Sequence, residues 1–185
     1  MADRSDGGGQ TAGFVNYWLE QRQDLNPQVL ALELTLARLN LLSKRAATWA
    51  AESHGVTATD YSLLAVIKRG REGRPIGPSD LAKLFNLMPS VITYRVNQLV
   101  ERGLAQRAEK PGDRRAILLH ATDKGAAMVD SILTALTGRL GDGLGALDAF
   151  PDGRDRFQQL LGVLVRRLEE LEAEAVAPPP PESEG

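Results

Sequence analysis

The feature that most constrains the fold of this sequence is a change of periodicity in its middle. Residues 79–85 and 89–103 carry apolar side chains at helical spacing, and a short turn separates them. After Gly103 the pattern shortens, and residues 104–107 and 116–120 are predicted to form two strands joined by a Pro-Gly turn. A helix, a turn, a second helix and a β-hairpin are therefore expected in that order.

Longer helical patterns flank this central unit on both sides. Asn26 followed by Pro27 has the residue types of an N-cap and a first helical position, so a long helix is predicted to begin there. Thr57 and Asp60 have the spacing of a capping box, and Thr122 supplies a cap for a helix after the hairpin. The flanking helices are predicted at residues 14–23, 27–54, 61–69, 123–140 and 154–175.

The composition excludes several classes of chemistry. The chain of 185 residues contains no cysteine, which excludes disulfides, thiolate-bound zinc and cysteine nucleophiles. Its two histidines, His54 and His120, do not have the spacing of a metal site, and neither a GxSxG motif nor a P-loop is present. We therefore expect no enzyme activity, no catalytic residue, no bound metal and no cofactor. No apolar run approaches the ~20 residues that span a bilayer, so no membrane partner is expected.

The charges are divided unevenly along the chain. The net charge of the whole sequence is −2, but residues 68–115 hold eleven Lys and Arg against five Asp and Glu, which leaves +6 there and −8 elsewhere. A basic cluster by itself is more often a solvated surface than a nucleic-acid site. Here the cluster coincides with the predicted helices and hairpin, and this coincidence favours binding to a polyanion such as DNA.

The second helix of the central unit has an apolar side and a polar side. At 100° per residue, Ile92, Val96 and Leu99 fall on one side. The opposite side and its flanks carry side chains that can form hydrogen bonds, namely Ser90, Thr93, Tyr94, Asn97, Gln98 and Glu101. Such a face suits the major groove of DNA, where amides, hydroxyls and methyl groups read base edges. The same pattern also arises on a core-packed helix whose polar side meets only water, and this helix alone does not decide between the two.

The central fifty residues resemble the winged helix-turn-helix of the MarR family of bacterial transcription regulators; they read IGPSDLAKLFNLMPSVITYRVNQLVERGLAQRAEKPGDRRAILLHATDKG. The resemblance rests on the SDLAKLF helix, the SVITYRVNQLVERGL recognition helix and the PGDRR wing. It implies a mainly α fold with a small β-hairpin wing and with N- and C-terminal dimerisation helices. It also implies a cytoplasmic homodimer that binds a palindromic operator in double-stranded DNA, usually as a repressor.

The resemblance also implies which residues contact DNA. In the wing, Asp113 matches the aspartate that orients the groove-entering arginine, here Arg115, while Arg114 is expected at a phosphate. Ser79 lies at the start of the helix before the recognition helix. The full set of expected DNA-binding residues is Ser79, Ser90, Thr93, Tyr94, Arg95, Asn97, Gln98, Asp113, Arg114 and Arg115.

The outer helices carry apolar stripes that are too long for one small domain to cover, and we interpret them as a dimer interface. The residues expected in it are Leu32, Leu36, Phe157, Leu164, Leu168 and Leu171. The predicted organisation is a disordered tail at 1–12, N-terminal dimerisation helices at 13–55, a winged helix-turn-helix at 56–121, C-terminal dimerisation helices at 122–176 and a disordered Pro-rich tail at 177–185.

A small-molecule effector is the remaining partner that the resemblance suggests. Trp18, QRQDLNP and HGV-T-x-x-D also resemble the branch of the family that responds to urate-like ligands. However, Ser62 stands where that branch has an aspartate, and Gln98 replaces an arginine, so urate is not the expected ligand. Trp18 is predicted to pack in the core or in the dimer, and His54 to cap a helix or lie on the surface. The alternative function is a protein-interaction or architectural DNA-binding module without a ligand response.

Overall fold

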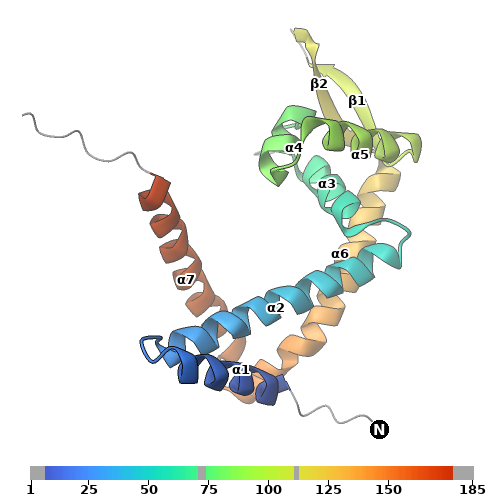
Figure 1. Cartoon of the computed structure of the whole chain (residues 1–185). Coiled ribbons are helices and arrows are strands. Elements are labelled where there is room, and N and C mark those ends of the chain that lie inside the picture. Colours follow the sequence, from blue (N-terminus) through green and yellow to red (C-terminus); the bar gives the residue numbers. More distant parts are fainter. Residues whose placement is uncertain (1–6, 71–73, 111–112, 177–185) are drawn as a thin grey trace, which may run out of the picture. The chain divides into compact units, whose positions relative to one another are not determined.

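The computed structural model describes residues 7–70, 74–110 and 113–176, and it divides into two compact units after Gly138. The first unit contains most of the elements, which are α1 (Gly7–Gln21), α2 (Pro27–Glu52), α3 (Ala58–Arg69), α4 (Pro78–Phe85), α5 (Pro89–Glu101), β1 (Ala105–Lys110), β2 (Asp113–Ala121) and most of α6 (Asp123–Leu144) (Figure 1). The second contains the end of α6, the 3₁₀ helix η1 (Gly145–Ala149) and α7 (Gly153–Val176). A mainly helical chain with one two-stranded antiparallel sheet in its described residues confirms the predicted fold class.

The predicted caps form at the starts of α2 and α3. The Asn26 Oδ1 atom accepts hydrogen bonds from the backbone N–H groups of Gln28 at 3.0 Å and Val29 at 3.2 Å. The Thr57 hydroxyl oxygen accepts a bond of 3.1 Å from the backbone N–H of Asp60. Each cap satisfies amides that have no partner inside the helix. Helix α2 therefore begins at Pro27 as predicted, whereas α3 begins directly after its cap at Ala58, three residues before the predicted range of 61–69.

Helix α1 begins at Gly7, which is earlier than the sequence predicted. The predicted start rested on Phe14, the first aromatic residue, and residues 7–12 were assigned to the tail. The segment from Gly7 to Gly13 contains no proline that would stop a helix, so the packed turns after it can extend backwards at a cost of about 1 kcal/mol per glycine. The remaining tail predictions, for residues 1–6 and 177–185, lie outside the described residues.

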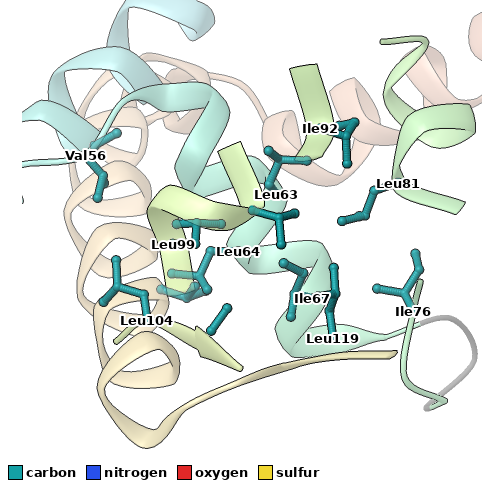
Figure 2. Packing of buried hydrophobic residues seen from close by; sticks show 14 of the residues in the cluster. Val56, Leu63, Leu64, Ile67, Ile76, Leu81, Ile92, Leu99, Leu104 and Leu119 are labelled. Atoms are coloured by element: carbon teal, nitrogen blue, oxygen red, sulfur yellow. The ribbon is translucent and has the colours of Figure 1, made fainter. Parts of the chain in front are cut away.

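The core of the first unit lies where α3, α4, α5 and the hairpin meet. Figure 2 shows Leu63, Leu64 and Ile67 of α3 among side chains from the other elements, and all of these side chains are buried. The side chains of Ile92, Val96 and Leu99 are buried as the helical spacing of α5 predicted. Each such side chain contributes about 1.5–3 kcal/mol relative to exposure, so the buried side of α5 fixes which side faces outward.

The hairpin is anchored by a strand-like contact that the sequence did not predict. Ile76 forms an isolated antiparallel bridge with Leu119 of β2, and the Leu119 N–H donates to the Ile76 carbonyl at 2.9 Å. Pro75 and Gly77 flank Ile76, and these residue types are typical of loops, so no strand was expected there. Both β1 and β2 are also longer than predicted, and their register shifts at a bulge between Glu109 and Lys110.

Helix α6 begins directly against the loop that precedes β1. The Thr122 hydroxyl donates to the Gly103 carbonyl at 2.7 Å and accepts from the Gly125 N–H at 3.0 Å. Gly125 itself is buried, and a Cβ atom on it would overlap the carbonyl oxygen of Leu104. Close approach of the two backbones therefore requires glycine at this position.

The predicted dimer residues lie on the surface or at its edge within their own units. Leu32 is 52% exposed, Leu168 54% and Leu171 44%. The other predicted dimer residues are half-buried, namely Leu36, Phe157 and Leu164. None of the described side chains of helix α7 is buried. The helix carries Leu168 and Leu171 together with further exposed apolar side chains at 160, 163 and 165. These stripes are available for contact with a second chain, and the homodimer stays a prediction at this point.

Candidate nucleic-acid interface

The turn between α4 and α5 is built around Asn86. This residue adopts the left-handed conformation, with φ 49° and ψ 47°, which asparagine tolerates better than most residues. The next backbone N–H, that of Leu87, donates to the Ala82 carbonyl at 3.0 Å and closes the end of α4. Pro89 then opens α5, so a tight turn sets the direction of the second helix relative to the first.

An ion pair joins α5 to the start of α3. The Arg95 guanidinium donates from Nη1 to the Asp60 Oδ1 atom at 2.8 Å, and the side chains are only 29% and 14% exposed. The other carboxylate oxygen of Asp60 accepts from the Thr57 hydroxyl at 2.7 Å. Arg95 therefore differs from the other residues predicted to contact DNA, because its charged group points back to the cap of α3.

A second link joins α5 to the hairpin. The Arg107 Nη2 atom of β1 donates to the Asn97 Oδ1 atom at 2.6 Å. At the end of α5, Arg102 donates to the Gly55 carbonyl at 2.9 Å, and its own carbonyl accepts from Lys124 at 3.0 Å. These bonds connect α5 and its C-terminal end with the hairpin, with the turn before α3 and with the start of α6.

The structure brings most of the predicted contact residues together on α5. Ser90, Thr93 and Tyr94 are exposed there, with Tyr94 at 64%, and Ser79 is exposed on α4. Gln98 is half-buried and donates to the Glu101 carboxylate at 3.1 Å. The three wing residues have their backbone in β2, but their side chains lie outside the described part of the structure, so their roles stay predictions: Asp113, Arg114 and Arg115.

Two further predictions concern single residues on the N-terminal helices. His54 has its Nδ1 atom 2.8 Å from the Ala50 carbonyl oxygen at the end of α2, which confirms the predicted capping role. Trp18 is 40% exposed and packs edge-on against Tyr17 at a ring distance of 5.5 Å, so it belongs to an exposed aromatic cluster and not to the core. Among the described residues, no group of three or more His, Asp or Glu side chains could hold a metal ion. No helix in that part of the chain has an apolar stretch long enough to cross a membrane.

Comparison with known proteins identifies the family. The sequence profile of the MarR family matches residues 54–116, a range that contains α3, α4, α5 and β1. The transcriptional regulator PecS of Dickeya dadantii is 27% identical over 124 residues, which are 67% of this chain and 75% of PecS. The match assigns residues 54–116 of the chain to the MarR family.

Solved MarR-family structures share the fold. MarR of Escherichia coli in its apo form superimposes with a TM-score of 0.58 at 22% identity, over 74% of this chain and 96% of that one. The transcriptional repressor CouR bound to a 23-mer DNA duplex gives 0.59 at 25% identity, over 74% of this chain and 92% of CouR. CouR from Rhodococcus jostii RHA1 has also been solved with p-coumaroyl-CoA. That structure gives a TM-score of 0.57 at 24% identity, over 80% of this chain and 93% of CouR.

The MarR helix-turn-helix of this chain also exposes apolar residues that sequence reasoning missed. Met88, at the N-cap of α5, is 70% exposed, and Val91 in its first turn is 37% exposed. The sequence contains a signal for Val91. It precedes Tyr94, which was predicted to face outward, by three residues, and side chains at this spacing lie next to each other along a helix.

Proposed function

We propose that this MarR-family protein is a sequence-specific DNA-binding regulator whose reading element is α5. The observation that carries the proposal is the Arg107–Asn97 bond, which joins the outward helix to the hairpin inside a segment with a net charge of +6. A helix for the major groove and a hairpin for the neighbouring groove are then held as one unit, and the charge attracts the phosphate backbone.

The proposed active form is a homodimer on a palindromic operator in double-stranded DNA. A two-fold dimer places its two reading helices in successive major grooves, about 34 Å or 10 base pairs apart. The exposed apolar stripes of α2 and α7 supply surface for the dimer contact. Binding at the operator would repress transcription by excluding polymerase, in the cytoplasm, where operator DNA is found. Similarity to CouR, a transcriptional repressor that has been solved on a DNA duplex, supports this direction of regulation.

A small-molecule effector completes the proposal. The support is CouR, which has been solved with p-coumaroyl-CoA as well as with DNA. A ligand that binds the DNA-free form better than the bound form would lower operator affinity by the ratio of its two affinities. Addition of such a compound should therefore raise the measured dissociation constant of a selected duplex without unfolding the protein.

The test of the proposed function is selection of bound duplexes from a randomised pool with the purified full-length protein. The expected result is a palindromic consensus whose half-sites lie about 10 base pairs apart. Affinity should fall steeply with salt, because each phosphate that the protein contacts releases a counterion. Each such contact makes the slope of log affinity against log salt more negative by about 0.9. Recovery of no consensus, with weak binding that ignores sequence, would contradict the proposal and favour a protein-interaction or architectural module.

A further inference from the structure

Three large side chains with apolar surface stand at the entry to α5, where a reading helix meets base edges. Met88 is 70% exposed, Val91 37% and Tyr94 64%. They are three residues apart in sequence, so each lies next to the following one, and together they form a strip that winds around the start of the helix. Exposed apolar groups in this place are unexpected on a surface that only meets water.

Four polar side chains of α5 already form bonds within the protein. Thr93 donates to the Pro89 carbonyl at 2.9 Å, and Gln98 donates to Glu101 at 3.1 Å. Arg95 pairs with Asp60. Asn97 accepts from Arg107, so its carbonyl oxygen is occupied. These bonds occupy part of the hydrogen-bonding capacity of the four side chains, whereas the apolar entry side is exposed.

The surrounding charge identifies what covers this apolar side. The exposed residues lie within the segment that carries a net charge of +6, which attracts DNA and disfavours a basic protein partner. In the major groove the one apolar group on a base edge is the C5-methyl of thymine. An apolar helix start that enters the groove therefore has one complementary base.

We propose that Met88, Val91 and Tyr94 read thymine methyl groups, so that the half-site of the operator is specified in part by thymines at the positions facing the start of α5. The proposal rests on the proposed function, since it names the base chemistry read by the same helix. In this proposal, part of the base specificity of α5 comes from apolar contacts and not from hydrogen bonds.

The experiment replaces thymine with uracil, which removes the methyl group and leaves the hydrogen-bonding edge unchanged. The duplex recovered by selection is synthesised with thymine or with uracil at each half-site position, and the dissociation constant of the full-length protein is measured for both. Affinity should fall about fourfold for each thymine that is read, which corresponds to burial of one methyl group.

Variants locate the effect on the protein. Met88→Ala and Val91→Ala should bring the thymine-to-uracil affinity ratio toward one at the positions that they face. Leu84→Ala is the matched control, because Leu84 is 62% exposed but lies on α4, where it lines a cleft with Val66 and Ile76. This control should keep the wild-type ratio. Circular dichroism of each variant shows whether its helices are intact.

The outcomes separate the two proposals. Equal affinity of the wild-type protein for thymine and uracil duplexes would overturn methyl readout while leaving operator binding in place. A ratio that survives in both Met88→Ala and Val91→Ala would overturn the assignment to these residues. A selection that yields no preferred duplex would remove the proposed function, and methyl readout with it.

Discussion

The Arg107 guanidinium of β1 lies 2.6 Å from the amide oxygen of Asn97 on α5. Asn97 was expected to contact DNA, and Arg107 belongs to the basic segment of residues 68–115. The bond links the hairpin to the helix that we propose reads the duplex. The protein therefore uses part of its polar surface to position itself before any base is contacted.

The first prediction is that Arg107→Ala weakens operator binding by about tenfold, because it removes both a positive charge and the link to Asn97. Arg69→Ala removes another exposed charge from the same basic segment and should cost only about threefold. Titration of a selected duplex measures both. If the two variants lose the same affinity, the Arg107–Asn97 link has no positioning role.

The second prediction concerns the ion pair between Arg95 and Asp60. Asp60→Ala should lower the free energy of unfolding by about 1–3 kcal/mol, because it leaves a partly buried guanidinium without its partner and removes the acceptor of the Thr57 hydroxyl. Urea denaturation measures the loss. The comparison is Asp24→Ala: a hydrogen bond from Arg22 lowers the pKa of Asp24, but that pair is exposed to water and its removal should leave the midpoint unchanged. Equal midpoints for both variants would show that the α3–α5 pair does not stabilise the fold.

The third prediction uses two glycines of the same helix. Gly125→Ala should destabilise the protein by about 2–4 kcal/mol, because the new Cβ atom overlaps the Leu104 carbonyl oxygen and forces α6 away from the β1 loop. Gly138→Ala meets no atom within 4 Å and should instead stabilise the helix by about 0.5–1 kcal/mol. Thermal unfolding followed by circular dichroism distinguishes the two. A stable Gly125→Ala variant would contradict the close approach of the two backbones.

The fourth prediction tests the dimer. Replacement of Leu164 and Leu168 with Glu places two charges on the apolar stripe of α7, so we expect a monomer or an aggregate that no longer binds a selected duplex. Gln158→Glu with Gln159→Glu adds the same charge to exposed polar positions of α7 and should remain a dimer. Sedimentation velocity gives the oligomeric state of each. A well-folded Leu variant that still sediments as a dimer rules out this stripe as the interface.

Local signals in the sequence predicted local structure well. The Asn26–Pro27 and Thr57–Asp60 patterns predicted the caps of α2 and α3. The spacing of Ile92, Val96 and Leu99 predicted the buried side of α5. Caps and periodicity act over one or two turns of helix, so a short stretch of sequence contains the information that they need.

Contacts between distant segments could not be predicted in the same way. The family resemblance placed Arg95 among the expected DNA contacts, but its long side chain turns back to Asp60, which lies 35 residues earlier in the sequence. The pairing of Ile76 with Leu119 depends in turn on how the hairpin packs on the loop before α4. Such contacts are set by tertiary packing, which no single window of sequence displays.

The measurement that tests the central claim most directly is the affinity of the full-length protein for a selected duplex before and after insertion of about five base pairs between the half-sites. The insertion turns one half-site to the opposite side of the duplex, so two helices held by one dimer can no longer enter both major grooves. We predict that affinity falls to that of a random duplex. Undiminished binding with the five-base-pair insertion would contradict a rigid dimer that reads a palindromic operator through α5.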